Sequence, residues 1–186
     1  VLREYLDIFV VVYLDDILIY SKKKEDHTEH VRKVFRKLRE YNLLMDPEKC
    51  SFNVKRVTFL GYVITTEGVE MTKDRIQAVL DWPIPTSVKE VQSYLGFANY
   101  CRKFIKGFGG IAKPLTDLTR KDQEFKWTPE AQKAFETLRK AFTEEPILVN
   151  FDPDKIILLE TDASDHSIGA CISQNDDQGK ARPVAY

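Results

Sequence analysis

The chain has few cysteines and no long apolar run, and both absences narrow what it can be. Its 186 residues include three cysteines, which are odd in number, far apart and without Cys-x-x-Cys spacing. This pattern argues against a disulfide framework, and we expect reduced thiols in an intracellular protein. No apolar run approaches the roughly 18 residues that span a bilayer, and no signal peptide is visible, so no membrane partner is expected.

A strong excess of basic residues is also missing. The net charge is -1, which argues against a generally basic nucleic-acid binder. The charges are unevenly distributed, however: residues 71–145 hold 13 basic and 10 acidic side chains, and residues 146–186 hold 3 and 7. Such a gradient fits a groove that touches phosphates locally beside an acidic, cation-binding tail, although an excess this small also arises by chance.

The composition indicates a folded protein, and both ends indicate that it is part of a larger one. A hydrophobic content of 43% over this length allows a sizeable core in one or two domains. The chain begins at Val1 without an initiator Met, and residues 184–186 fall inside an expected strand. We therefore expect a piece of a longer protein.

Two short apolar runs with a pair of acids between them form the central feature. Residues 8–13 and 17–20 are rich in Val, Ile and Tyr, and they predict a β-hairpin turning at residues 14–16. At a turn the strand alternation is broken, so Asp15 and Asp16 can both approach one site. Paired carboxylates suit a hard divalent cation in a nucleotidyl-transfer site. The alternative is an ordinary solvated turn.

An amphipathic helix is predicted next. Asp26 and Glu29 have capping-box spacing, and an apolar stripe of about four turns follows at Val31, Val34, Phe35 and Leu38. The basic outer face is either solvated or binds phosphate. His27 and His30 lie close enough to share a metal ion, but no third ligand is near them in the sequence.

A second hairpin is predicted beyond this helix. Residues 57–64 are strand-like, Glu67 and Gly68 form a turn, and residues 69–71 return. Gly61, inside the expected strand, indicates a bend, a close approach of the backbone to a ligand, or only a bulge.

These motifs, in this order, resemble the palm of reverse transcriptases of long-terminal-repeat retrotransposons, most closely the gypsy-like group. The resemblance implies that Asp15 and Asp16, in Tyr-x-Asp-Asp, bind metal, with Tyr13 among the nucleic-acid contacts. It also implies that Leu60, Gly61 and Tyr62 form the primer grip, which holds the 3′ end of the growing strand. The family commonly reads Leu-Gly-His there, so Tyr62 departs from the pattern.

The next stretch is predicted to be helical. Thr72 caps one short helix, ended by a proline-rich linker at 82–85, and Ser87 with Glu90 opens a second. Residues 99–106 interleave aromatics with cations, which indicates either a buried stripe or a surface that grips a nucleic-acid backbone. The block from 82 to 115 resembles the thumb and connection of the same elements, and this implies template-primer contacts for Arg102, Lys103 and Lys106.

The end of the chain changes from a helix to strands. Thr128 and Pro129 begin a helix that ends at residues 144–146, and three antiparallel strands are then predicted at 155–162, 168–173 and 183–186. Three strands cannot cover both of their faces, so further chain is expected. The stretch from Thr161 resembles the opening strands of the fused ribonuclease H domain, which implies that Asp162 is a metal-binding carboxylate; Asp165 is interpreted as a turn residue only.

The predicted fold is α+β: a partial polymerase palm at 1–71, a helical thumb and connection at 72–145, and truncated ribonuclease H-like strands at 146–186. The resemblance implies an RNA-directed DNA polymerase using Mg²⁺ (or Mn²⁺), with an RNA template, a DNA primer, an RNA-DNA hybrid, deoxynucleoside triphosphates and the rest of a polyprotein as partners. It further implies a location in the cytoplasm, a virus-like particle or the nucleus.

In the family, another palm aspartate and further ribonuclease H acids come from outside these residues, so we expect the 186-residue piece alone to be inactive. The alternatives are a non-enzymatic nucleic-acid-binding module or relic, a metal-dependent nuclease centred on Asp162, and an unrelated α+β protein.

Overall fold

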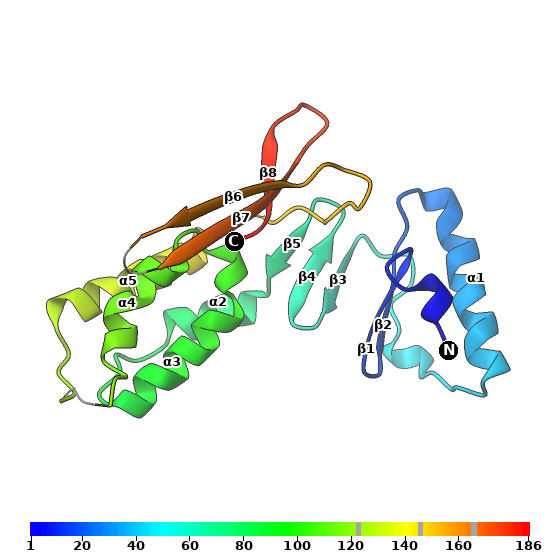
Figure 1. Ribbon diagram of the computed structural model, residues 1–186. Coiled ribbons are helices and arrows are strands. Elements are labelled where there is room, and N and C mark those ends of the chain that lie inside the picture. Colours follow the sequence, from blue (N-terminus) through cyan, green and yellow to red (C-terminus); the bar gives the residue numbers. More distant parts are fainter. Residues whose placement is uncertain (122–123, 145–146, 165–166) are drawn as a thin grey trace. The chain divides into compact units, whose positions relative to one another are not determined.

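The computed structural model describes residues 1–121, 124–144, 147–164 and 167–186. The chain divides into two compact units, Val1–Phe59 and Leu60–Tyr186, whose elements are labelled in Figure 1. Each unit has its own apolar core. Within the described ranges, no helix has the length and apolar character required to cross a membrane.

The first unit is built on an antiparallel hairpin and one long helix. β1 (Val10–Tyr13) pairs with β2 (Asp16–Ile19), α1 (Lys24–Glu40) follows, and β3 (Arg56–Phe59) ends the unit. The apolar stripe of α1 contributes Val34 to a small core made with Leu2, Phe9 and Val10. The predicted hairpin and amphipathic helix are therefore confirmed.

Two local predictions in this region are wrong. α1 begins at Lys24, before the expected capping box, so Asp26 lies inside the first turn, where its negative charge favours the helix N-terminus. The predicted strand from 57 to 64 is interrupted at Leu60 and Gly61, whose φ angles are +52° and +73°. A positive φ cannot continue an extended strand, so β3 ends at Phe59 and β4 begins at Tyr62.

The second unit begins with a hairpin, and its described residues continue as four α-helices. β4 (Tyr62–Thr65) pairs antiparallel with β5 (Val69–Met71) around the predicted turn at Gly68. The helices are α2 (Lys73–Leu80), α3 (Val88–Tyr100), α4 (Phe108–Asp117) and α5 (Pro129–Thr143).

Two of these helices begin at predicted side-chain caps. Ser87 Oγ accepts a hydrogen bond from the Glu90 amide at the start of α3, and Thr128 Oγ1 accepts one from the Ala131 amide at the start of α5. Each bond satisfies a backbone donor that has no partner within the helix. The predicted end of α5 is confirmed up to its C-cap at Glu144; residues 145 and 146 lie outside the described ranges.

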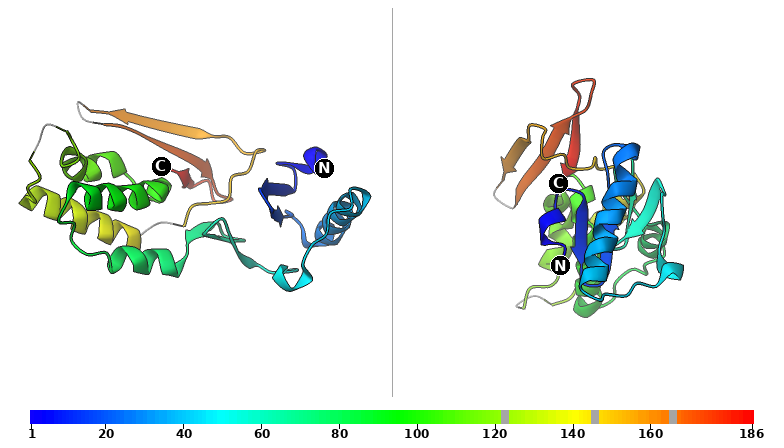
Figure 2. Two further views of the ribbon diagram at one scale, coloured as in Figure 1. Left: turned by 90° about the horizontal axis from the view of Figure 1, so that it is seen from below. Right: turned by 90° about the vertical axis from the view of Figure 1, so that its right-hand side faces the viewer.

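Large aromatic side chains fill the core between these helices. The Tyr94 ring lies 4.7 Å from the Phe135 ring and 5.6 Å from the Trp82 ring, measured between centroids. Tyr94 and Phe135 are fully buried, as is Phe104, which follows α3 in a short 3-10 turn. Figure 2 shows α3, α4 and α5 grouped together as one helical layer.

The second unit ends in a three-stranded antiparallel sheet. β6 (Leu158–Ala163), β7 (Ile168–Asn175) and β8 (Ala181–Ala185) lie in that order, with Leu158 opposite Ser173 and Asp162 opposite Gly169. All six residues of β6 are exposed. Mixed helices and antiparallel sheets confirm the predicted α+β class, and the exposed strand agrees with the expectation that three strands cannot cover both faces.

Candidate functional site

The β1–β2 hairpin presents the Asp15 and Asp16 carboxylates at its tip. Because Tyr13 pairs with Asp16, the turn consists of Leu14 and Asp15 alone, one residue tighter than predicted. Leu14 has a φ of +51°, and a positive φ at the first of two turn residues is the pattern of a type II′ hairpin turn. One carboxylate therefore comes from the turn and the other from the first position of β2.

Both carboxylates are exposed and free to bind a ligand. Neither forms a hydrogen bond or an ion pair through its side chain with any described residue. Their oxygens are the hard ligands that magnesium prefers. The described residues contain no group of three or more metal-binding side chains. The pair thus fits a divalent cation in its chemistry but supplies only part of a coordination shell.

Tyr13 lies beside this pair. It is 56% exposed at the last position of β1, directly opposite Asp16. An exposed aromatic ring next to two carboxylates can pack against a ribose or a base. Its position suits the predicted nucleic-acid contact, which stays a prediction.

The predicted primer grip is a second tight turn. Leu60 and Gly61 both have positive φ, as a type I′ turn requires, and Tyr62 begins β4. A Cβ atom added to Gly61 would lie 2.0 Å from Arg75 Nη2. An arginine of α2 therefore packs closely against the backbone at Gly61, while the role of this turn in holding a primer stays a prediction.

Tyr62 is held by α3 through contacts that the sequence did not reveal. Its ring is stacked on the Tyr100 ring at 5.5 Å with an interplanar angle of 3°. The Tyr62 hydroxyl donates to the Tyr100 carbonyl at 3.2 Å, and the Tyr100 hydroxyl donates to the Leu60 carbonyl at 2.9 Å. Burial, followed by the contact with Tyr100, raises the pKa of Tyr62 above its usual range. Tyr100 and Arg75 were missed because no local pattern links them to Leu60.

The three predicted thumb cations are in different environments. Arg102 and Lys106 are exposed, and Arg102 Nη1 donates to Asn99 Oδ1 at 3.3 Å. Lys103 is half-buried, with its ammonium 3.8 Å from the centroid of the Tyr62 ring. Burial lowers the pKa of Lys103 because it disfavours the charged form. Arg102 and Lys106 are therefore the more accessible to a phosphate.

Asp162 lies on the exposed strand β6, opposite Gly169 of β7. It forms no side-chain hydrogen bond or ion pair with a described residue. The structure does not group it with other acids into a metal site within the described ranges. Asp165, predicted to be only a turn residue, lies outside those ranges.

His27 and His30 both contact side chains of their own unit. Ser21 Oγ lies 3.0 Å from His27 Nδ1 and 2.8 Å from His30 Nδ1, and the His30 ring stacks on Phe9 at 4.0 Å. The Ser21 hydroxyl contacts both imidazoles, and the Phe9 ring packs against that of His30, so both histidines belong to the packing of the N-terminal half of α1. The shared metal site weighed from the sequence gains no third ligand among the described residues.

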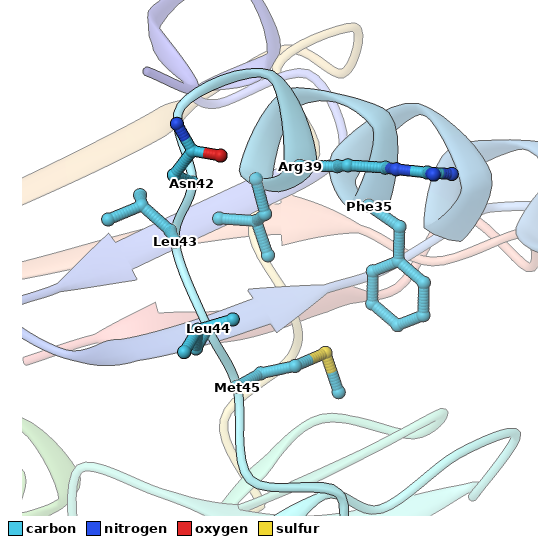
Figure 3. A pocket seen from close by; sticks show the side chains of 7 residues that line it. Phe35, Arg39, Asn42, Leu43, Leu44 and Met45 are labelled. Carbon is cyan, nitrogen blue, oxygen red and sulfur yellow. The ribbon is translucent and has the colours of Figure 1, made fainter.

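A shallow apolar hollow in the first unit has no predicted site residue in its lining. Figure 3 shows its lining side chains at the end of α1 and in the following loop. The volume of the hollow is about 290 Å³. Its lining is mainly aliphatic and aromatic and includes none of the predicted carboxylates, grip residues or cations. The lining residues are Phe35, Leu38, Arg39, Asn42, Leu43, Leu44 and Met45. The hollow offers few groups for catalysis.

Comparison with known families matches both ends of the chain. Residues 1–64, which include the Asp15–Asp16 hairpin, match the family described as "Reverse transcriptase (RNA-dependent DNA polymerase)". Residues 127–186, which include β6 to β8, match "RNase H-like domain found in reverse transcriptase". The predicted boundaries after residues 71 and 145 stay a prediction.

The whole chain is similar to retrotransposon polyproteins. It is 42% identical over 186 residues to the transposon Tf2-3 polyprotein of Schizosaccharomyces pombe, and 41% identical to the Tf2-7 polyprotein. Each match covers the whole of this chain, but the chain spans only 14% of the length of each relative.

Solved structures give the same result. A foamy viral protease-reverse transcriptase in complex with dsDNA matches with a TM-score of 0.81 and 28% identity, over 100% of this chain and 39% of that one. The same viral protein in complex with RNA/DNA hybrid matches with a TM-score of 0.79 and 28% identity, over 100% of this chain and 25% of that one.

The chain belongs to the reverse transcriptases that carry a ribonuclease H-like domain. More particularly, it is a segment of the retrotransposon polyprotein kind, and a gypsy-like long-terminal-repeat element fits.

Proposed function

We propose that this chain forms part of an RNA-directed DNA polymerase that copies retrotransposon RNA into DNA. The observation that carries the proposal is the exposed pair Asp15 and Asp16, which has no side-chain partner among the described residues and lies at a tight hairpin turn. This turn is inside the segment that matches the reverse-transcriptase family. The template is RNA, the primer is DNA, and the substrates are deoxynucleoside triphosphates. Other parts of the polyprotein supply the remaining groups of the site.

The carboxylates hold the cation in this account. A divalent cation, Mg²⁺ or Mn²⁺, would supply activation of the primer 3′-hydroxyl and neutralisation of charge on the leaving pyrophosphate. Asp15 and Asp16 contribute ligands from a turn whose backbone is fixed by strand pairing on both sides. Since neither carboxylate forms an ion pair within the described ranges, no such contact has to break there before the metal binds.

The nucleic acid is contacted from the second unit. The related viral structures contain dsDNA and RNA/DNA hybrid, which supports a template-primer duplex as the partner here. Arg102 and Lys106 are exposed cations that can pair with phosphates, and Leu60 and Gly61 form the turn proposed to hold the primer end. These contacts position the duplex without reading its sequence.

A ribonuclease H function belongs to the complete protein. Asp162 is proposed as one of its metal-binding carboxylates, with the other acids supplied by further chain. The same logic applies to the polymerase centre, because two carboxylates do not complete a two-metal site. The isolated 186-residue chain is therefore proposed to be inactive in both reactions, and the complete protein is proposed to work in the cytoplasm, a virus-like particle or the nucleus.

Primer extension tests the proposal. The complete protein should extend a DNA primer on an RNA template with Mg²⁺ and stop when the metal is chelated, whereas the 186-residue chain should give no extension. If the complete protein binds the duplex in a salt-dependent way but never extends the primer, the chain serves a non-enzymatic nucleic-acid-binding module. Extension by the 186-residue chain alone would show that its carboxylates are sufficient.

A further inference from the structure

Two tyrosines, Tyr62 and Tyr100, attach the Leu60–Gly61 turn to α3 through hydrogen bonds and ring stacking. The Tyr100 hydroxyl donates a hydrogen bond to the Leu60 carbonyl oxygen at 2.9 Å. Tyr62, the residue after the turn, donates to the Tyr100 carbonyl at 3.2 Å. The two residues are 38 positions apart, yet their rings are nearly parallel. We call this pair, Tyr62 and Tyr100, the tyrosine clasp.

Two cations complete the packing of the clasp. The Arg75 guanidinium lies 4.4 Å from the Tyr100 ring centroid and 5.1 Å from that of Tyr62. The Lys103 ammonium lies 3.8 Å from the Tyr62 ring centroid. Both cations are within the distance at which an aromatic face attracts positive charge.

Gly61 suits the turn because its φ of +73° is a conformation that L side chains rarely adopt, and the Arg75 side chain packs against it. Arg75 Nη2 lies 2.0 Å from the place where a Gly61 Cβ would be, so the guanidinium occupies that space. Its Nη1 is buried with no hydrogen-bond partner in the described part of the chain. The faces of the two tyrosine rings are therefore among the contacts that hold the guanidinium in position.

We propose that the tyrosine clasp, with Arg75 and Lys103 against its rings, fixes the Leu60–Gly61 turn, so that Tyr62 and Lys103 are positioning residues of the primer grip and not contacts to the primer. The primer-positioning role rests on the proposed function, whereas the contacts of the clasp do not depend on it. It gives a physical reason for a tyrosine where the family commonly has histidine: the phenol reaches the Tyr100 carbonyl and stacks on the Tyr100 ring.

The clasp is tested first in the 186-residue chain, without any activity. Amide hydrogen exchange at residues 60–63 should quicken about fivefold or more in Tyr100→Phe and in Tyr62→Phe, because each variant keeps its ring but loses one hydrogen bond. Tyr94→Phe is the matched control, since the Tyr94 hydroxyl is buried without a partner among the described residues; exchange at residues 60–63 should not quicken in this variant. Unchanged exchange in both clasp variants would overturn the proposal.

The positioning role is tested in the complete protein. Tyr100→Phe should lower kcat for nucleotide addition about threefold to tenfold with the template-primer Kd within about twofold, because the primer is bound but misplaced. A raised Kd with unchanged kcat would overturn the positioning role.

Salt dependence separates Lys103 from its neighbour. Arg102→Gln should reduce the slope of log affinity against log salt by about 0.9, as expected for one lost phosphate contact, whereas Lys103→Met should leave that slope unchanged. An equal reduction in both variants would make Lys103 a phosphate contact and overturn its assignment. A complete protein that never polymerises defeats the proposed function, while the exchange experiment still decides whether the clasp exists.

Discussion

Leucine occupies a strained backbone position in each functional turn. Leu14 and Leu60 have φ angles of +51° and +52°, a region that costs a bulky residue about 1–3 kcal/mol. Leu14 is 84% exposed, so burial of its side chain does not offset this cost. Strain beside two free carboxylates, and at the turn held by the tyrosine clasp, is consistent with positions selected for function. Sequence patterns cannot predict such conformations because leucine rarely adopts them.

Tyr94 offers a residue where the structure predicts a gain in stability. Its ring is fully buried among Trp82 and Phe135, but its hydroxyl has no hydrogen-bond partner among the described residues. Because an unpaired buried hydroxyl loses its bonds to water on folding, Tyr94→Phe should raise the free energy of unfolding by about 1 kcal/mol. Urea denaturation of the variant and the parent chain measures the difference; a loss of stability would indicate a hidden partner for the hydroxyl.

Gln174 is the opposite case, a buried polar side chain that is fully used. It is 2% exposed, and its amide donates to the carbonyls of Asp152 and Lys155 and accepts from the Asp152 amide. Gln174→Leu should lower the free energy of unfolding by about 2–4 kcal/mol, because the Asp152 amide and the Asp152 and Lys155 carbonyls would lose their hydrogen bonds to Gln174. Gln92→Leu, on the exposed side of α3, is the control in the same denaturation assay. Equal stability of the two variants would contradict this reading.

The β4–β5 hairpin depends on close backbone contact at its turn. Gly68 has a φ of +152°, and a Cβ there would lie 2.1 Å from the Leu148 carbonyl oxygen. That oxygen accepts a hydrogen bond from the Val69 amide at 2.7 Å, which joins the hairpin to the chain before β6. The turn itself was predictable from Glu67 and Gly68, but its long-range partner was not.

A pair of glycine variants tests this contact. Gly68→Ala should destabilise the chain by at least about 2 kcal/mol, because backbone atoms cannot move aside cheaply. Gly96→Ala should instead stabilise it by about 0.5–1 kcal/mol, since Gly96 lies within α3 with nothing within 4 Å of its Cβ position. Thermal denaturation should therefore shift in opposite directions; a shift in the same direction would refute the packing described at Gly68.

Local signals explain how much of the elements was predictable. The caps at Ser87 and Thr128 and the hairpin around Asp15 are encoded in a few adjacent residues, and they were predicted. The start of α1 was misplaced because helix ends are decided by small energy differences. The stacking of Tyr62 on Tyr100 joins residues far apart in the sequence, and no periodicity reports such a contact.

Across the molecule, the exposed apolar sheet agrees with a chain that is part of a larger protein. Leu159 is 63% exposed on β6, and Ile168 is 85% exposed on β7. Large apolar side chains exposed on neighbouring strands are a typical place for further packing. This agrees with relatives of which the chain spans 14%, and it supports the proposal that the polymerase and ribonuclease H sites are completed elsewhere.

Asp15 and Asp16 are proposed as the metal-binding carboxylates of the polymerase, and kcat for primer extension by the complete protein is the sharpest test of this assignment. Asp15→Asn should lower kcat by at least about a hundredfold while the template-primer Kd changes little, because the duplex is held by other residues. Asp26→Asn, an exposed acid in the first turn of α1, is the control and should stay within about twofold. Equal kcat in Asp15→Asn and the parent protein would show that Asp15 does not bind the catalytic metal.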